Sequence, residues 1–94
     1  MAPPKTSDRR FTYADYRNWP DDERWELIDG EAYAMSPVPT ISHQTLAGQL
    51  FRQIDEALDG APCRALISPV DVLLPAPDEA DDRSTTVVQP DILV

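Results

Sequence analysis

The dipeptide Asp29-Gly30 constrains the fold of this chain more than any other sequence feature, because it interrupts an alternating segment at residues 25–35. Both residues tolerate a positive φ, which a two-residue hairpin turn requires at its two central positions. A loop of this length also fixes the pairing of the flanking strands, so that Ile28 faces Glu31. The segment therefore predicts an antiparallel β-hairpin.

Side chains alternate between the two faces of a strand, so this register gives the hairpin one apolar and one mixed face. The predicted core face comprises Trp25, Leu27, Ala32 and Ala34. The opposite face comprises Glu26, Ile28, Glu31 and Tyr33. Two carboxylates on one surface make Glu31 and, less strongly, Glu26 candidates for a functional role. The alternative is that both glutamates are merely solvated.

Two helices are predicted, one before and one after the hairpin. Thr12 and Asp15 have the spacing of a capping box, which starts a short helix that Pro20 ends. Ser42 is the expected N-cap of a longer helix that runs to about Asp59. The apolar stripe of the longer helix comprises Ala47, Leu50, Phe51, Ile54 and Leu58.

Two strand-like runs follow the long helix, at residues 65–74 and 86–94, and an acidic loop joins them. Helices and strands together predict one small domain of the α/β (α+β) class over residues 11–94. Residues 1–10 lack periodicity and are predicted to be a disordered arm. The second run still has strand character at Val94, and an exposed strand end favours pairing with another chain. We therefore expect that this chain is the front part of a longer protein. Formation of a homodimer is a further expectation.

Length and composition narrow the class of protein. At 94 residues the chain has room for one domain. No segment has the roughly 20 apolar residues of a transmembrane helix, and the start lacks the apolar core of a signal peptide. A cytoplasmic protein without membrane contact is therefore expected. Cys63 is the only cysteine, which excludes an internal disulfide. We expect its side chain to be a small apolar group that is buried or half-buried.

The charge balance is acidic, with seventeen acidic and eight basic residues and a net charge of −9. This balance opposes the basic surface that simple binding to a phosphate backbone requires. A metal-dependent nuclease is still compatible with an acidic sequence, since carboxylates hold its cation. The charge alone therefore disfavours DNA binding without excluding metal-assisted cleavage.

Two aspartates interrupt apolar runs, and the only histidine falls at the start of the long helix. Asp91 interrupts the run at 86–94, where a carboxylate costs free energy unless it is paired or bound to a metal, so a functional role is favoured. Asp71 interrupts the other run, and for it a solvent-exposed edge position is favoured. His43 falls at the first turn of the long helix, where the helix dipole prefers a neutral ring. It could contact a phosphate, orient a carboxylate or simply pack.

Five strings in a fixed order resemble one protein family. They are Trp25-Glu26-Leu27-Ile28-Asp29-Gly30-Glu31, Met35-Ser36-Pro37, Ser42-His43-Gln44, Pro69-Val70-Asp71-Val72 and Val88-Gln89-Pro90-Asp91-Ile92-Leu93-Val94. Each string is weakly specific alone, but their order and spacing are specific together. Over residues 11–94 the chain resembles the Uma-type putative restriction endonuclease family, which belongs to the PD-(D/E)XK nuclease superfamily.

The resemblance implies a restriction-endonuclease-like core, a mixed sheet flanked by helices, that cleaves DNA phosphodiesters with Mg²⁺ or Mn²⁺. Asp91 matches the aspartate of the family's Pro-Asp motif and is thereby implied to be the first metal ligand and a catalytic residue. Glu31 matches a family position in the Glu-Leu-Ile-Asp-Gly-Glu string. The resemblance implies that it approaches the metal site as a second catalytic candidate.

The sequence departs from the family pattern after Val94, where the strand with the second carboxylate and the cationic residue is expected. Lys5, the only lysine, lies in the predicted arm. We therefore expect a truncated metal-dependent DNA endonuclease that is inactive as this chain alone. The alternatives are a non-catalytic binding or assembly module and a remnant of the nuclease without function.

Overall fold

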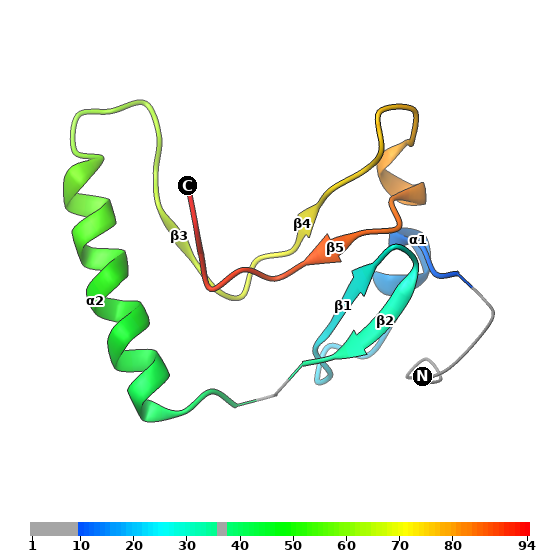
Figure 1. The fold of residues 1–94 in the computed structure, drawn as a ribbon, viewed down its shortest axis with the longest axis horizontal. Helices are drawn as coiled ribbons and strands as arrows, with labels where there is room; N and C mark the ends of the chain where they lie inside the picture. The colour runs from blue at the N-terminus through cyan, green and yellow to red at the C-terminus, as the bar shows by residue number, and fades with distance from the viewer. Residues whose placement is uncertain (1–9, 36–37) are drawn as a thin grey trace. The chain divides into compact units, whose positions relative to one another are not determined.

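A computed structural model describes residues 10–35 and 38–94 of the chain (Figure 1). The chain divides into two compact units. Unit 1 comprises Met1–Pro37 and Asp71–Val88, and unit 2 comprises Val38–Val70 and Gln89–Val94. Along the sequence, the chain therefore runs from unit 1 into unit 2, back into unit 1, and then into unit 2 again. Residues 1–9 of the predicted arm lie outside the described residues.

The predicted hairpin is the main structural element of unit 1. β1 (Trp25–Ile28) and β2 (Glu31–Ala34) pair in antiparallel fashion, and Ile28 lies opposite Glu31 as expected. The turn residues Asp29-Gly30 have φ angles of 50° and 82°. Positive φ at both central positions is the requirement of the type I′ turn, whose twist suits a hairpin. The sequence prediction of the turn and of the register is confirmed.

The hairpin extends into a four-stranded antiparallel sheet with the order β2-β1-β5-β4. β5 (Val87–Val88) pairs with β1 at Leu27, and β4 (Val72–Leu73) pairs with β5 at the edge of the sheet. Leu27 and Val87 are fully buried, so the point where the strands meet is also the centre of the core. Phe11 completes this core, and the partly buried residues packed against it are Tyr13, Tyr16, Trp19, Ala32 and Leu73.

The short helix α1 (Tyr13–Tyr16) begins as the sequence predicts. The backbone N–H of Thr12 donates to the Asp15 carboxylate at 3.0 Å, which is the reach-back contact of a capping box. After the helix, the Trp19 ring lies 5.3 Å from the Phe11 ring and 6.0 Å from the Trp25 ring, measured between centroids. A single helical turn is unstable alone, so these aromatic contacts hold it against the sheet.

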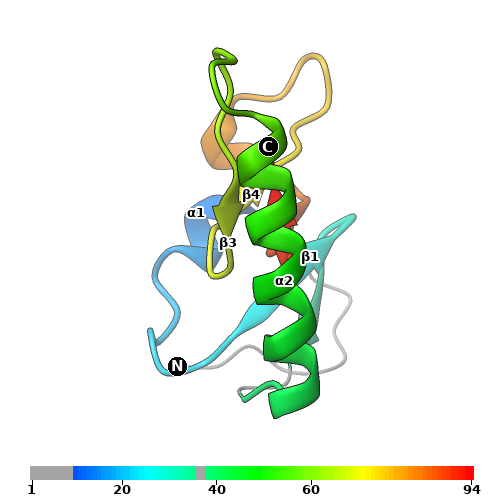
Figure 2. The same cartoon turned by 90° about the vertical axis from the view of Figure 1, so that its left-hand side faces the viewer.

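Unit 2 contains the long continuous helix α2 (Ile41–Ala57), seen most clearly in Figure 2, and a two-stranded antiparallel pair. The prediction of Ser42 as the N-cap is wrong, because Thr40 occupies that position. The Thr40 hydroxyl oxygen accepts a hydrogen bond from the His43 backbone N–H at 3.1 Å. Both residue types are good caps, and the cap at Thr40 lets two more residues join the helix.

The two long strand-like runs are each broken into two short strands, which corrects the prediction of continuous strands. The run at 65–74 gives β3 (Leu66–Ile67) and β4, and the run at 86–94 gives β5 and β6 (Ile92–Leu93). Both breaks contain a proline, Pro69 or Pro90. Proline has no N–H to donate to a ladder, so pairing stops there. β3 pairs with β6 in unit 2 and β4 with β5 in unit 1.

The class of the fold is α+β, as predicted, and every strand pair in the described residues is antiparallel. The predicted stripe of α2 is largely confirmed, since Ala47 is buried and the half-buried members are Phe51, Ile54 and Leu58. Leu50, by contrast, is exposed.

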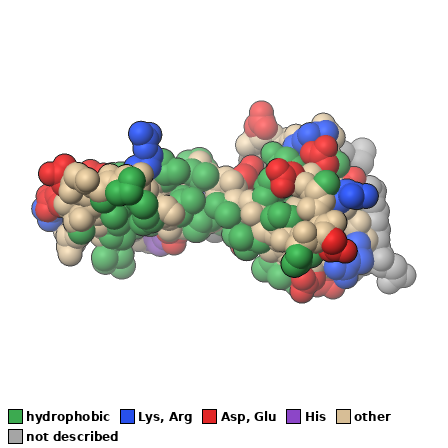
Figure 3. Space-filling view, turned by 90° about the horizontal axis from the view of Figure 1, so that it is seen from above, with side chains coloured by type: hydrophobic (Ala, Val, Ile, Leu, Met, Phe, Trp, Pro, Cys, Tyr) green, Lys and Arg blue, Asp and Glu red, His purple; other side chains and the backbone are tan. Residues whose placement is uncertain are grey.

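Several apolar side chains lie on the surface of the two units, and hydrophobic side chains are visible on the face drawn in Figure 3. The prediction of a buried or half-buried Cys63 is wrong, because its side chain is exposed. Cys63 follows the turn that ends α2, where Gly60 has a positive φ.

Gly30→Val should lower the free energy of unfolding by about 1–3 kcal/mol, the usual cost of a strained backbone position. Gly30 has a φ of 82°, and an added Cβ would lie 2.9 Å from the Cβ of Arg10, which has no freedom to rotate away. Urea denaturation measures the change. Asp29→Asn is the matched control at the neighbouring position, and it should change stability by less than about 0.5 kcal/mol because asparagine tolerates positive φ. Equal stability of the valine variant and the wild type would contradict the turn geometry.

Candidate functional site

Asp91 lies in the break between β5 and β6, immediately before Ile92. Its backbone carbonyl accepts a hydrogen bond from the Ser68 N–H at 2.9 Å, next to the pairing of Ile67 with Ile92. Its side chain is 64% exposed. The expectation of a carboxylate in a strand built for burial is therefore wrong, because the proline break ends the strand before Asp91. No burial cost needs to be offset there.

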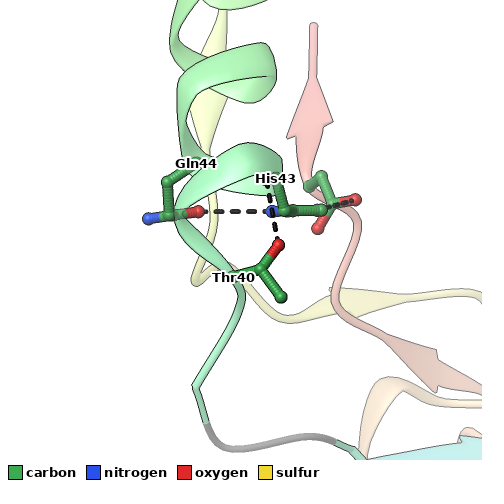
Figure 4. Close-up of polar contacts among 4 residues, drawn as sticks. Thr40, His43 and Gln44 are labelled. Atoms are coloured by element: carbon green, nitrogen blue, oxygen red, sulfur yellow. Dashed lines mark hydrogen bonds and ion pairs between the residues drawn. The ribbon is translucent and has the colours of Figure 1, made fainter.

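The side chain of Asp91 is paired with His43, which lies in the first turn of α2. The distance from His43 Nε2 to Asp91 Oδ2 is 3.1 Å. The other ring nitrogen of His43, Nδ1, lies 3.3 Å from Gln44 Oε1. Figure 4 shows this arrangement around the capping residue Thr40. Of the roles considered for His43, the structure shows contact with a carboxylate.

The electrostatics of His43 differ from the expectation of a neutral ring. The hydrogen bond to Asp91 raises the pKa of His43 above its ordinary value of 6.5, and the hydrogen bond to Gln44 and the Asp91 charge act in the same direction. The dipole at the start of a helix disfavours a cation, but its effect is small at an exposed position. The nearby carboxylate therefore shifts the ring toward its protonated form.

Glu31 lies on the exposed edge strand β2 of unit 1. Its Oε2 accepts a hydrogen bond from the Tyr33 hydroxyl at 2.8 Å. This hydrogen bond is the largest cause that raises the pKa of Tyr33, and the Glu31 charge adds to it. Glu26, half-buried on the neighbouring strand β1, belongs to the same unit. The structure thus places Glu31 and Asp91 in different units.

Asp71 is exposed and immediately precedes the edge strand β4, as the sequence analysis favoured. Its Oδ1 accepts a hydrogen bond from the Tyr16 hydroxyl at 2.7 Å. The same hydroxyl lies 3.1 Å from the carbonyl oxygen of Trp25. Asp71 therefore connects α1 to the sheet in unit 1, which is a structural role.

The described residues supply only part of a metal site. Mg²⁺ takes six oxygen ligands, usually one or two carboxylates together with waters and substrate phosphates. Asp91 offers one carboxylate of suitable chemistry. Within residues 10–35 and 38–94, however, no group of three or more histidine, cysteine, aspartate or glutamate side chains is arranged to hold a metal ion. These residues alone do not form a complete cation site.

Fold and site together define an α+β protein that presents an exposed carboxylate beside an imidazole. The sequence model of the Uma2 family, described as putative restriction endonuclease, matches residues 13–94, and the chain belongs to this family. No curated protein and no solved structure matches the chain. Among the helices in the described part of the chain, none combines the length and the apolar character that crossing a bilayer requires.

A proton NMR titration of His43, the only histidine, should give a pKa above 6.5. Asp91→Asn removes the main cause of the shift and should return this pKa toward 6.5. Because the folded pKa is raised, the pair adds stability below the unfolded pKa, and that contribution is lost as the pH rises through the folded pKa. Identical titration midpoints in the two proteins would show that the contact is absent in solution.

Proposed function

We propose that the complete gene product is a metal-dependent endonuclease that hydrolyses DNA phosphodiester bonds, and that Asp91 is one of its metal ligands. The observation that carries the proposal is the family match over residues 13–94, which includes the Pro90-Asp91 motif. The exposure of the Asp91 carboxylate supports it, since a ligand must be reachable by a hydrated cation and by a phosphate.

The geometry around Asp91 fits a ligand better than a structural carboxylate. Both the backbone carbonyl of Asp91 and its Oδ2 have hydrogen-bond partners within unit 2. An exposed ion pair of this kind contributes little to stability, so structural need alone gives a weak reason for an aspartate at this position. Apart from Asp91 and the second acidic candidate Glu31, the cation takes its ligands from groups other than the described side chains.

Glu31 enters the proposal as a second acidic group of the active site. Its side chain is exposed, and the Tyr33 hydroxyl donates to one of its two carboxylate oxygens. A carboxylate is the ligand type that a hard cation takes in proteins. In the assay described below, Glu31→Gln should reduce cleavage if this assignment is right, and unchanged cleavage would remove Glu31 from the site.

Asp91→Asn should abolish Mg²⁺- or Mn²⁺-dependent DNA cleavage by the complete gene product. The amide has the size of the carboxylate but lacks the charge that holds a hard cation. Cleavage of supercoiled plasmid at saturating Mn²⁺ measures the effect, and far-UV circular dichroism checks the fold. Asp78→Asn, at an exposed position of the acidic loop, is the matched control and should cleave like the wild type.

Two outcomes of this experiment would contradict the proposal. If the Asp91→Asn protein cuts DNA as fast as the wild type, Asp91 is not a ligand that the reaction needs. If the wild-type complete gene product cuts no DNA with either cation, the endonuclease assignment fails and a non-catalytic binding role replaces it.

A further inference from the structure

We infer that His43 is a positioning residue, whose ring fixes the orientation of the Asp91 carboxylate. In this arrangement Oδ2 of Asp91 accepts the hydrogen bond from His43, and Oδ1 is the oxygen that Asp91 presents to a ligand. The inference deepens the proposed function and rests on it only for its effect on DNA cleavage. Its structural part concerns two side chains of unit 2 and stands by itself.

Both ends of the contact are held by regular structure. On one side, the His43 backbone N–H donates to the capping hydroxyl of Thr40, which sets the position of His43 in the first helical turn. On the other side, the Asp91 carbonyl accepts from Ser68, at the end of the β3–β6 pair. Each backbone is therefore held within its own element, and the contact itself depends on the torsions of the two side chains.

The ring itself is oriented through Nε2, and through Nδ1 as well when both nitrogens carry a proton. Gln44 Oε1 lies 3.3 Å from Nδ1, and Asp91 Oδ2 lies 3.1 Å from Nε2. A carboxylate only accepts hydrogen bonds, so Nε2–H is the donor in this contact whether the ring is neutral or charged. The required property of His43 is therefore a hydrogen-bond donor at the Nε2 position rather than a particular charge.

The exposure of His43 and Asp91 indicates that their contact orients the Asp91 side chain rather than stabilising the fold. The side chains of His43 and Asp91 are 41% and 64% exposed. An ion pair this exposed contributes little to folding. An aspartate this exposed would also sample several rotamers without a partner, at an entropic cost when it binds a ligand. A partner that selects one rotamer beforehand reduces that cost, which is the effect of second-layer hydrogen bonds on metal ligands.

The test compares two amide substitutions at position 43 that differ only in where they place the donor. In His43→Gln the amide nitrogen lies close to the position of Nε2, whereas in His43→Asn it lies close to the position of Nδ1 and does not reach Asp91. Gln49→Asn is the matched control. It replaces glutamine by asparagine at an exposed position of the same helix, away from the His43–Asp91 pair.

The first readout needs neither metal nor activity. Three-bond couplings across χ1 of Asp91, measured by NMR on the 94-residue chain, should show one rotamer in the wild type, in His43→Gln and in Gln49→Asn. In His43→Asn they should show rotamer averaging, and the Asp91 carboxyl carbon shift should change. Averaged couplings already in the wild type, or unchanged couplings in His43→Asn, would overturn the inference.

The second readout is Mn²⁺-dependent cleavage by the complete gene product. His43→Asn should lower the rate by about 10–100-fold, the usual loss when a second-layer partner is removed. His43→Gln should remain within about threefold of the wild type, well short of that loss. Equal rates for the two variants would overturn the positioning role. A wild type that cleaves no DNA would defeat the proposed function instead, and the NMR couplings would still decide whether His43 orients Asp91.

Discussion

The backbone donors missing at Pro69 and Pro90 determine how the second half of the chain is arranged. Without these prolines, each apolar run would be expected to continue as one strand, and the two runs would form a single ladder. With them, one half of each run pairs in unit 1 and the other half in unit 2. The exposed position of Asp91 follows from the same break, since Asp91 directly follows Pro90. The missing N–H groups of the two prolines thus interrupt strand pairing and leave the Asp91 carboxylate exposed.

Local patterns predicted the elements of the fold that depend on neighbours in sequence. The Asp29-Gly30 turn, the register of the hairpin and the capping box at Thr12 all depend on residues within a few positions of one another, and all are confirmed. The core pairing of Leu27 with Val87 was beyond prediction from the sequence because nothing local specifies which strands become neighbours. The error at Ser42 arose because Thr40 serves equally well as a cap. The error at Cys63 arose because its exposure depends on where it lies in the fold rather than on its residue type.

The candidate site was predictable in its members but not in its contacts. Asp91 and His43 were both selected from the sequence, Asp91 because it interrupts an apolar run and His43 because it is the only histidine and falls at the first turn of the long helix. They lie 48 positions apart, so the hydrogen bond between them depends on tertiary structure. That contact also raises the pKa of His43, in the direction opposite to the effect of the helix terminus. The partner of Asp91 therefore matters as much to the chemistry of the pair as Asp91 itself.

The distribution of two rare side chains gives the protein separate spectroscopic reporters for its two units. Both tryptophans, Trp19 and Trp25, belong to the aromatic cluster of unit 1, whereas the single, exposed thiol of Cys63 belongs to unit 2. Intrinsic tryptophan emission thus follows the melting of unit 1. A dye attached through the thiol would follow unit 2 in the same sample. Whether the two halves unfold together or in sequence is thus measurable on the unmodified amino-acid sequence, without introducing a probe residue.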